Sequence, residues 1–156
     1  MSGEPVDHGR DESGAEIDEG ESREEAAHWC YVRPTDVASD AAWEPIKALL
    51  DKHCESYRAE DVRAAVGSGH LQAWVVRERG GLLAVMLTQI VRRRDYSALV
   101  VTHIGGTGLR KWIRDWHLLR RYAAENGCSS VEGYGRDGWL RLIPAERIGI
   151  AWRMRL

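Results

Sequence analysis

The chain lacks any apolar run that approaches the roughly 20 residues of a membrane-spanning helix. Its first residues are acidic and contain no apolar stretch of the kind that forms a secretory signal peptide. Both absences argue against a membrane-bound or exported protein. We therefore expect a cytoplasmic location and no membrane partner.

Cysteine is also scarce, with only Cys30, Cys54 and Cys128. Their number is odd, no two form a Cys-x-x-Cys pair, and no histidine stands at a typical ligand spacing from them. This pattern predicts free or buried thiols in a reducing compartment rather than disulfides, and it predicts no metal site.

The net charge of −2 conceals a strong asymmetry along the chain. Residues 1–29 carry ten acidic and two basic side chains, a charge of −8, whereas the remainder carries 20 basic and 14 acidic ones, or +6. The first segment has almost no large apolar residues, so burial cannot offset the entropy of ordering it. We expect a disordered acidic tail over residues 1–27 and one folded domain over 28–156. The tail would keep the chain soluble, or it would tether or mask the basic domain.

Hydrophobic periodicity predicts a mixed α+β domain. The first expected helical segment follows Asp36 and ends near His53; Pro45 indicates either that the regular helix starts near it or that the first turn is irregular. Further helices are expected over 59–67 and 109–126, with a short helical turn at 137–143. The expected strands cover 29–34, 71–78, 82–91, 96–104, 129–135 and 148–154. This order, β-α-α-β-β-β-α-β-α-β, gives a mostly antiparallel sheet with one parallel pair and with helices on both faces.

One segment in this order carries a chemical signal. An apolar strand runs into His103-Ile104-Gly105-Gly106-Thr107-Gly108, and the long helix follows directly. Glycines let the backbone approach a ligand closely, and free N–H groups at a helix start attract phosphate oxygens. The segment has neither the Gly-Lys-Ser/Thr of a P-loop nor a full dinucleotide-binding fingerprint. It is therefore either a different phosphate-binding loop or an ordinary turn between strand and helix.

The order of elements resembles that of the GNAT superfamily of acyl-CoA-dependent N-acyltransferases, over about residues 29–156. That family holds the pyrophosphate of coenzyme A at a Gln/Arg-x-x-Gly-x-Gly/Ala sequence, and His103 here replaces its first residue. The opening Tyr31-Val32-Arg33-Pro34-Thr35, and Gly127-Cys128 ahead of a strand, also resemble the family. Gly135-Arg136-Asp137-Gly138-Trp139 is similar to GNAT-like proteins encoded in bacteriophage genomes.

The resemblance implies that acetyl-CoA is a substrate and that an amine accepts the acetyl group. The residues that it places on the coenzyme are His103, Ile104, Gly105, Gly106, Thr107, Gly108 and Arg110.

The acid and base for acetyl transfer are harder to assign. The reaction needs a base to take a proton from the substrate ammonium and often an acid for the leaving thiolate. The three central strands contain one carboxylate, Glu78 beside a turn, and the family's usual Asn and Tyr positions correspond to Arg136 and Ile143.

Three other side chains are the remaining catalytic candidates: His103, Glu132 and Tyr134. His103 titrates near neutrality, as a base should, but it could equally contact a phosphate or the backbone. Glu132 could face the cleft or solvent. Tyr134 could donate a proton to the thiolate or pack against a neighbour.

Three functions stay open at this point. The first is an N-acetyltransferase with a divergent catalytic site. The second is a GNAT-fold protein without catalysis that binds a protein partner, such as a structural protein of a bacteriophage particle. The third is nucleic-acid binding through Arg92–Arg94 and the basic residues between 110 and 121. Those charges are typical of a solvated surface, and no aromatic side chain is clearly placed for base stacking, which argues against the third function.

Overall fold

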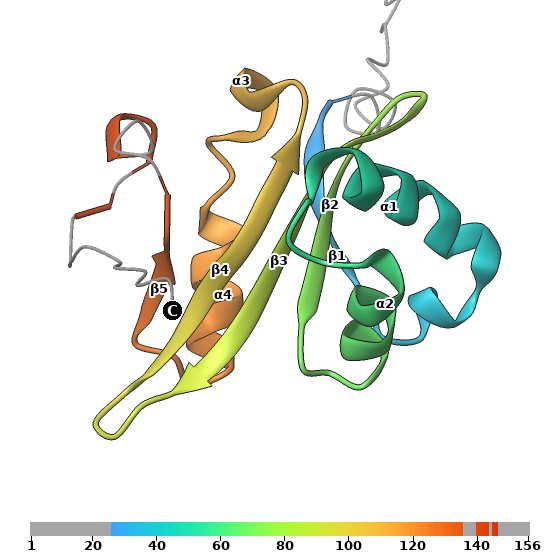
Figure 1. Ribbon diagram of the computed structural model, residues 1–156. Coiled ribbons are helices and arrows are strands. Elements are labelled where there is room, and N and C mark those ends of the chain that lie inside the picture. The colour runs from blue at the N-terminus through green and yellow to red at the C-terminus, as the bar shows by residue number, and fades with distance from the viewer. Residues whose placement is uncertain (1–25, 136–139, 144, 147–156) are drawn as a thin grey trace, which may run out of the picture.

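A five-stranded sheet with helices on both faces forms the protein (Figure 1). The computed structural model describes residues 26–135, 140–143 and 145–146. The strands are β1 (His28–Val32), β2 (Gln72–Glu78), β3 (Gly81–Arg92), β4 (Ser97–Gly106) and β5 (Ser130–Gly133). The helices are the 3-10 turn η1 (Asp36–Ala38), α1 (Asp40–His53), α2 (Ala59–Gly67), α3 (Leu109–Trp112) and α4 (His117–Glu125).

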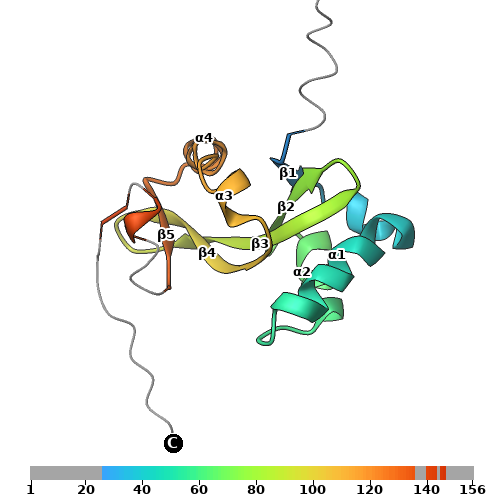
Figure 2. The same ribbon diagram turned by 90° about the horizontal axis from the view of Figure 1, so that it is seen from above.

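The strands lie in chain order, β1-β2-β3-β4-β5. The first three neighbouring pairs are antiparallel, and β4 and β5 are parallel because the chain crosses over through α3 and α4. Helices α1 and α2 cover one face of the sheet, and α3 and α4 cover the other (Figure 2). The predicted α+β class, with a mostly antiparallel sheet and helices on both faces, is confirmed.

Successive side chains along a strand point to opposite faces of the sheet, so each face has its own apolar core. On the α1/α2 face, helix residues pack on strand residues; the central members are Trp43, Ile46, Leu50, Val62, Val66, Val75, Val85 and Leu87. On the other face, α4 packs on the sheet through Leu119, Ala123, Trp74, Met86 and Leu99. All three cysteines are free, as the sequence predicts.

The first helix has an irregular start, the second of the two alternatives that Pro45 left open. The 3-10 turn η1 precedes α1, which begins at Asp40, and the Trp43 N–H already donates to the Ser39 carbonyl at 2.9 Å. Pro45 lies inside the helix, where its missing N–H removes a single hydrogen bond near the helix start. Burial of Trp43 and Ile46 on either side of Pro45 accounts for the tolerance of that loss.

The predicted long helix over 109–126 is wrong as a single element. The chain forms the four-residue α3, then turns at 113–116, and begins again as α4. The two pieces bury side chains in different places, because Trp112 packs with Trp29 and Val76 whereas Leu119 packs under the centre of the sheet. The basic residues between 110 and 121 therefore do not lie along one continuous helix.

The strand β4 is longer than predicted, since it runs on to Gly106 instead of ending at Ile104. Gly105 pairs with Val85, and Gly106 pairs with Ala84. At Gly106 φ is 147°, and a Cβ there would lie 2.4 Å from the Ala84 Cα. Close backbone packing, which only glycine allows, thus extends the strand into the predicted loop.

Other predicted boundaries shift less or cannot be compared. Helix α2 has the predicted bounds, whereas the predicted strand over 129–135 shortens to Ser130–Gly133. Residues 140–141 lie in a 3-10 turn. Residues 1–25, 136–139 and the predicted strand over 148–154 lie outside the described residues.

Replacement of Gly106 by alanine should destabilise the sheet strongly. The new Cβ would meet the Ala84 backbone, so β3 and β4 must separate at this end. We expect a loss of about 2–4 kcal/mol in urea unfolding, in the range of the larger single-residue effects. The control is Gly127→Ala, which has a φ of 72° but nothing within 4 Å of its Cβ, and which should lose about 1 kcal/mol. Equal losses in the two variants would refute the packing argument.

Candidate functional site

The strands β4 and β5 part midway along β4. Their parallel pairing runs from Ala98 opposite Ser130 to Val101 opposite Gly133, where β5 ends. Strand β4 continues for five more residues, of which the last four, 103–106, pair with β3 on one side only. Among the described residues, no strand covers the other edge of 102–106. This free edge leads directly to Gly108 and α3 (Figure 1).

A β-bulge marks the point where the strands part. Leu87 pairs with His103 and Thr88 pairs with Val101, which leaves Thr102 as an extra residue in β4. The Thr102 hydroxyl donates to the Leu87 carbonyl at 3.3 Å. Before the bulge, Leu99 and Val101 face α4, and after it Ile104 does. His103 is thereby turned to the α1 face, as a regular strand would not have done.

His103 lies against the end of α1. A Cβ on Gly105 would lie 2.7 Å from the His53 Cβ and 3.1 Å from His103 Nε2, so both histidines crowd the same glycine. Among the described residues, His103 Nε2 is a buried ring nitrogen without a hydrogen-bond partner. Burial lowers the pKa of His103, because desolvation penalises the imidazolium; the neighbouring His53 backbone opposes the shift. His103 therefore favours the neutral form that a base requires.

Glu132 is held by Arg93, which the sequence analysis considered only as part of a possible nucleic-acid-binding surface. Arg93, which follows β3, donates to the Glu132 carboxylate at 2.8 Å, and the Ser130 hydroxyl donates to it at 3.3 Å. The Glu132 side chain is only 9% exposed. Hydrogen bonds from Arg93 to Glu132 and to Tyr134 raise the arginine's pKa. Arg93 and Ser130 thus occupy both carboxylate oxygens, so Glu132 is engaged in structure rather than free to face a substrate.

The three catalytic candidates do not form a connected set. Glu132 pairs with Val100, which places it roughly 7–10 Å along the sheet from His103. Tyr134 follows β5 and is 71% exposed. Arg93 links Glu132 with Tyr134, whereas His103 contacts the end of α1 instead.

The predicted glycine loop is reduced to Thr107 and Gly108. The Thr107 N–H is already used, since it donates to the Leu83 carbonyl at 2.9 Å. Gly108 has a φ of 69°, in the left-handed region, and turns the chain into α3. Among the described residues, the backbone N–H groups of Gly108, Leu109 and Arg110 have no hydrogen-bond acceptor. Arg110 is exposed, so these N–H groups and the Arg110 side chain are open to an anionic ligand.

Two other residues near the loop are engaged in structure. Lys111 forms an ion pair with Glu78 at 2.5 Å, which joins α3 to the end of β2. Ile104 packs into the core beside Trp112 and Leu109. Of the residues predicted to hold the coenzyme, Gly105, Gly106 and Ile104 therefore shape the strand, and Gly108 and Arg110 remain available to a ligand.

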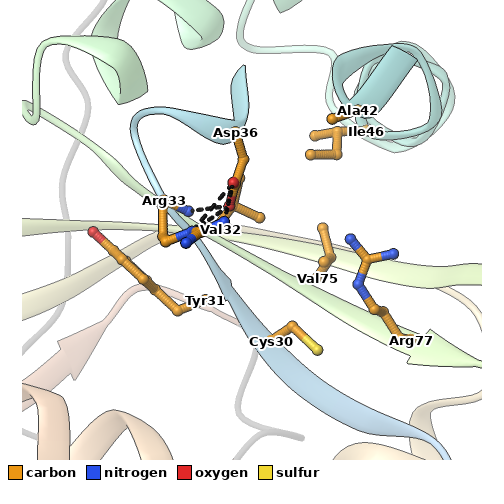
Figure 3. Close-up of a pocket in the computed structure, with 9 residues that line it drawn as sticks. All are labelled: Cys30, Tyr31, Val32, Arg33, Asp36, Ala42, Ile46, Val75 and Arg77. Carbon is orange, nitrogen blue, oxygen red and sulfur yellow. Dashed lines mark hydrogen bonds and ion pairs between the residues drawn. The ribbon is translucent and has the colours of Figure 1, made fainter. Parts of the chain in front are cut away.

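A separate cavity of about 390 Å³ lies at the β1 edge of the sheet (Figure 3). Its lining comes from β1, η1, α1 and β2, through Cys30, Tyr31, Val32, Arg33, Asp36, Ala42, Ile46, Val75 and Arg77. Arg33 and Asp36 face each other there in a 2.8 Å ion pair, which lowers the pKa of Asp36. Strands β2 and β3 separate this cavity from β4, so it is not part of the candidate site.

Searches for metal ligands and membrane spans gave no candidate within the described part of the chain. No three His, Cys, Asp or Glu side chains there come together as a metal-binding group. No helix there is long and apolar enough to cross a membrane.

No protein-family model matches this sequence, and no curated protein matches it either. Solved structures do match in fold. An aminoglycoside acetyltransferase from an uncultured soil sample matches with a TM-score of 0.62 and 11% identity, over 84% of this chain and 99% of that one. A ribosomal-protein-alanine N-acetyltransferase from Brucella melitensis biovar Abortus matches at 0.59 and 13%, over 82% and 99%. A GNAT family acetyltransferase from Staphylococcus aureus matches at 0.59 and 7%, over 84% and 99%. The chain therefore has the GNAT fold, as the order of its elements predicts.

Lowering the pH should destabilise the protein through His103. Its pKa is depressed in the folded state, so the unfolded chain binds the proton more readily. The stability that His103 contributes is present above its ordinary pKa of about 6.5 and is lost as the pH falls towards the folded value. Urea unfolding between about pH 7.5 and 5.5 should show a shallower pH dependence for His103→Gln than for the parent. An unchanged slope in His103→Gln would contradict the assignment.

Proposed function

We propose that this protein transfers the acetyl group of acetyl-CoA to an amine. The observation that carries the proposal is the parting of β4 from β5 at Val101 and Gly133, directly before the Gly108 turn. A thioester in this opening would reach the free edge of β4, and its phosphates would lie near the N–H groups of 108–110. The fold neighbours, which are acetyltransferases by description, support the same function.

The proposed coenzyme position uses backbone groups more than side chains. Three unpartnered N–H groups at 108–110 can donate to pyrophosphate oxygens, and the exposed Arg110 adds a positive charge. His103 lies on the opposite face of the sheet from α3. This separation favours a role for His103 in proton transfer over a role as a phosphate contact.

The proposed reaction needs one base and one acid. Neutral His103 would take a proton from the substrate ammonium, and the free amine would attack the thioester carbonyl carbon. A C–N bond forms, the C–S bond breaks, and the coenzyme leaves as a thiolate. The new amide nitrogen releases its remaining surplus proton, which balances the proton that the thiolate takes up. Tyr134, exposed at the end of β5, could return a proton to that thiolate. Glu132 is held by Arg93 and would set the charge of the site rather than transfer a proton.

A protein without catalysis, which binds a partner through the GNAT fold, is the second candidate. The observation that favours it is the engagement of Glu132 by Arg93, which leaves the described site without a free buried carboxylate. Within the part of the chain that the structure describes, no carboxylate orients His103, which lies against His53 at the end of α1. A structural protein of a bacteriophage would fit this function, on the resemblance of residues 135–139 alone. Fold does not settle activity.

A side chain at Gly108 should block the coenzyme. In Gly108→Ala, the new Cβ would contact the Leu83 side chain at 3.4 Å, so the domain should fold while the approach of a pyrophosphate is hindered. We expect at least a tenfold weaker affinity for acetyl-CoA by calorimetry. The control is Gly127→Ala, because φ is 72° at Gly127 and 69° at Gly108, so both variants strain the backbone in the same way. Gly127 lies far from the site, and its variant should bind acetyl-CoA as the parent does. Parent-like binding by Gly108→Ala would show that the coenzyme does not lie there.

Replacement of His103 by alanine should separate catalysis from binding. If His103 is the base, kcat should fall by roughly 10²–10⁴-fold while the affinity for acetyl-CoA barely changes. The acid limb of the pH–rate profile should be lost with it. His117→Ala serves as the control and should keep the parent's rate. If the variant instead has a raised KM for acetyl-CoA and recovers the parent's kcat at saturation, His103 is a coenzyme contact. If the parent itself shows no turnover with any amine, the second candidate function is favoured.

A further inference from the structure

Helices α3 and α4 and the turn between them present a positively charged surface. We define this basic surface by its five exposed members, Arg110, Arg114, His117, Arg120 and Arg121. Arg121 lies 3.9 Å from Glu125. In the part of the chain that the structure describes, Arg110, Arg114 and Arg120 form no ion pair. The sequence between 109 and 126 contains two acidic residues, Glu125 and the half-buried Asp115.

The basic surface lies beside the point where the N-terminal segment joins the domain. Ala27 and Trp29 pack against Trp112 of α3. The Trp29 and Trp112 rings meet edge to face at 5.2 Å, and the Trp29 indole N–H donates to the Trp112 carbonyl at 3.3 Å. Strand β1 accordingly begins at the same end of the sheet as α3 (Figure 1). The preceding residues are thus tethered next to the basic surface.

The segment 11–25, which lies outside the described residues, is complementary to the basic surface in charge. It reads DESGAEIDEGESREE, with eight acidic side chains and one basic one, a charge of −7 in 15 residues. A flexible chain of 15 residues has an end-to-end distance of roughly 20 Å. As helices, the four residues of α3 and the nine of α4 rise by roughly 6 Å and 14 Å. A segment joined to the domain beside α3 can therefore reach most of the surface.

We propose that the acidic segment 11–25 docks on the basic surface of α3 and α4 of its own chain. The tether gives the segment an effective concentration of about 1 mM at the surface. At that effective concentration, an intrinsic dissociation constant of about 0.1–0.3 mM is sufficient to keep the surface mostly occupied. The docked state needs no apolar anchor, because the attraction comes from charge alone.

Docking would compete with an anionic coenzyme, and this consequence rests on the proposed function. The segment would cover Arg110 and the neighbouring N–H groups, where the phosphates are proposed to lie. With the effective concentration and dissociation constant given above, the docked segment would weaken the apparent affinity for the coenzyme by about four- to tenfold. The acidic segment would thus act as an intramolecular, salt-sensitive inhibitor.

The test uses the full chain and needs no ligand. The acidic variant neutralises four side chains of the segment: Glu16→Gln, Asp18→Asn, Glu19→Gln and Glu21→Gln. Its control removes four exposed carboxylates elsewhere on the domain: Glu44→Gln, Glu55→Gln, Glu60→Gln and Asp95→Asn. Amide spectra recorded in about 0.02 M salt should show shifts over 109–121 in the acidic variant relative to the parent, and none there in the control. About 0.5 M salt should move the parent to the positions of the acidic variant.

A second variant pair locates the docking surface. In the parent, the amides of 11–25 should move when salt is added. The basic variant, Arg110→Gln with Arg114→Gln and Arg120→Gln, should lose that movement. A control with the same charge change, Arg58→Gln with Arg92→Gln and Arg94→Gln, should keep it. Identical low-salt spectra of the parent and the acidic variant, or equal behaviour of the two arginine variants, would overturn the proposal.

Acetyl-CoA titrations then separate the inhibitor from the coenzyme site. In low salt the acidic variant should bind about four- to tenfold more tightly than the parent, and the difference should vanish in high salt. If the amide shifts demonstrate docking but the two affinities are equal, the coenzyme does not use the basic surface. That result would leave the docking intact and contradict the proposed position of the phosphates.

Discussion

The pairing of the last residues of β4 with β3 alone holds the candidate site open. Gly105 and Gly106 keep β4 attached to Val85 and Ala84 after β5 has ended at Gly133. Glycine is required at 106 because the two backbones approach too closely for any Cβ. If this end of β4 followed another course, the free edge, the Gly108 turn and the orientation of His103 would all change. The close backbone packing at Gly106 thus also maintains the opening between β4 and β5.

The sequence predicted the framework of the fold but not its local departures. Apolar runs bounded by turn residues locate the sheet, and the acidic start and terminal glycine of 59–67 locate α2. The bulge at Thr102 has no signal in an unbroken apolar stretch, because an extra residue in one strand depends on the partner strand. The break between α3 and α4 likewise reflects two tertiary packing sites, for Trp112 and Leu119, which local periodicity cannot distinguish.

The sequence predicted which residues belong to the candidate site but not which residues they contact. The strand, glycine and helix order pointed to Gly108 and Arg110, which the structure leaves accessible. Arg93 was missed, since a run of three arginines after a strand reads as a charged turn. Its pairing with Glu132 depends on the parallel contact of β4 and β5, between residues 39 positions apart. That ion pair moves the proposed proton transfer away from Glu132 and towards His103.

The most direct test of the account is a map of where acetyl-CoA binds. Amide shifts of the full chain, followed during titration with acetyl-CoA, should change most over 102–110 and at the end of β5. Residues around the β1-edge cavity, such as Cys30 and Arg77, should stay unchanged. No shifts at millimolar acetyl-CoA, or shifts that gather at the β1 edge, would contradict the claim that the parting of β4 and β5 forms a coenzyme thioester site.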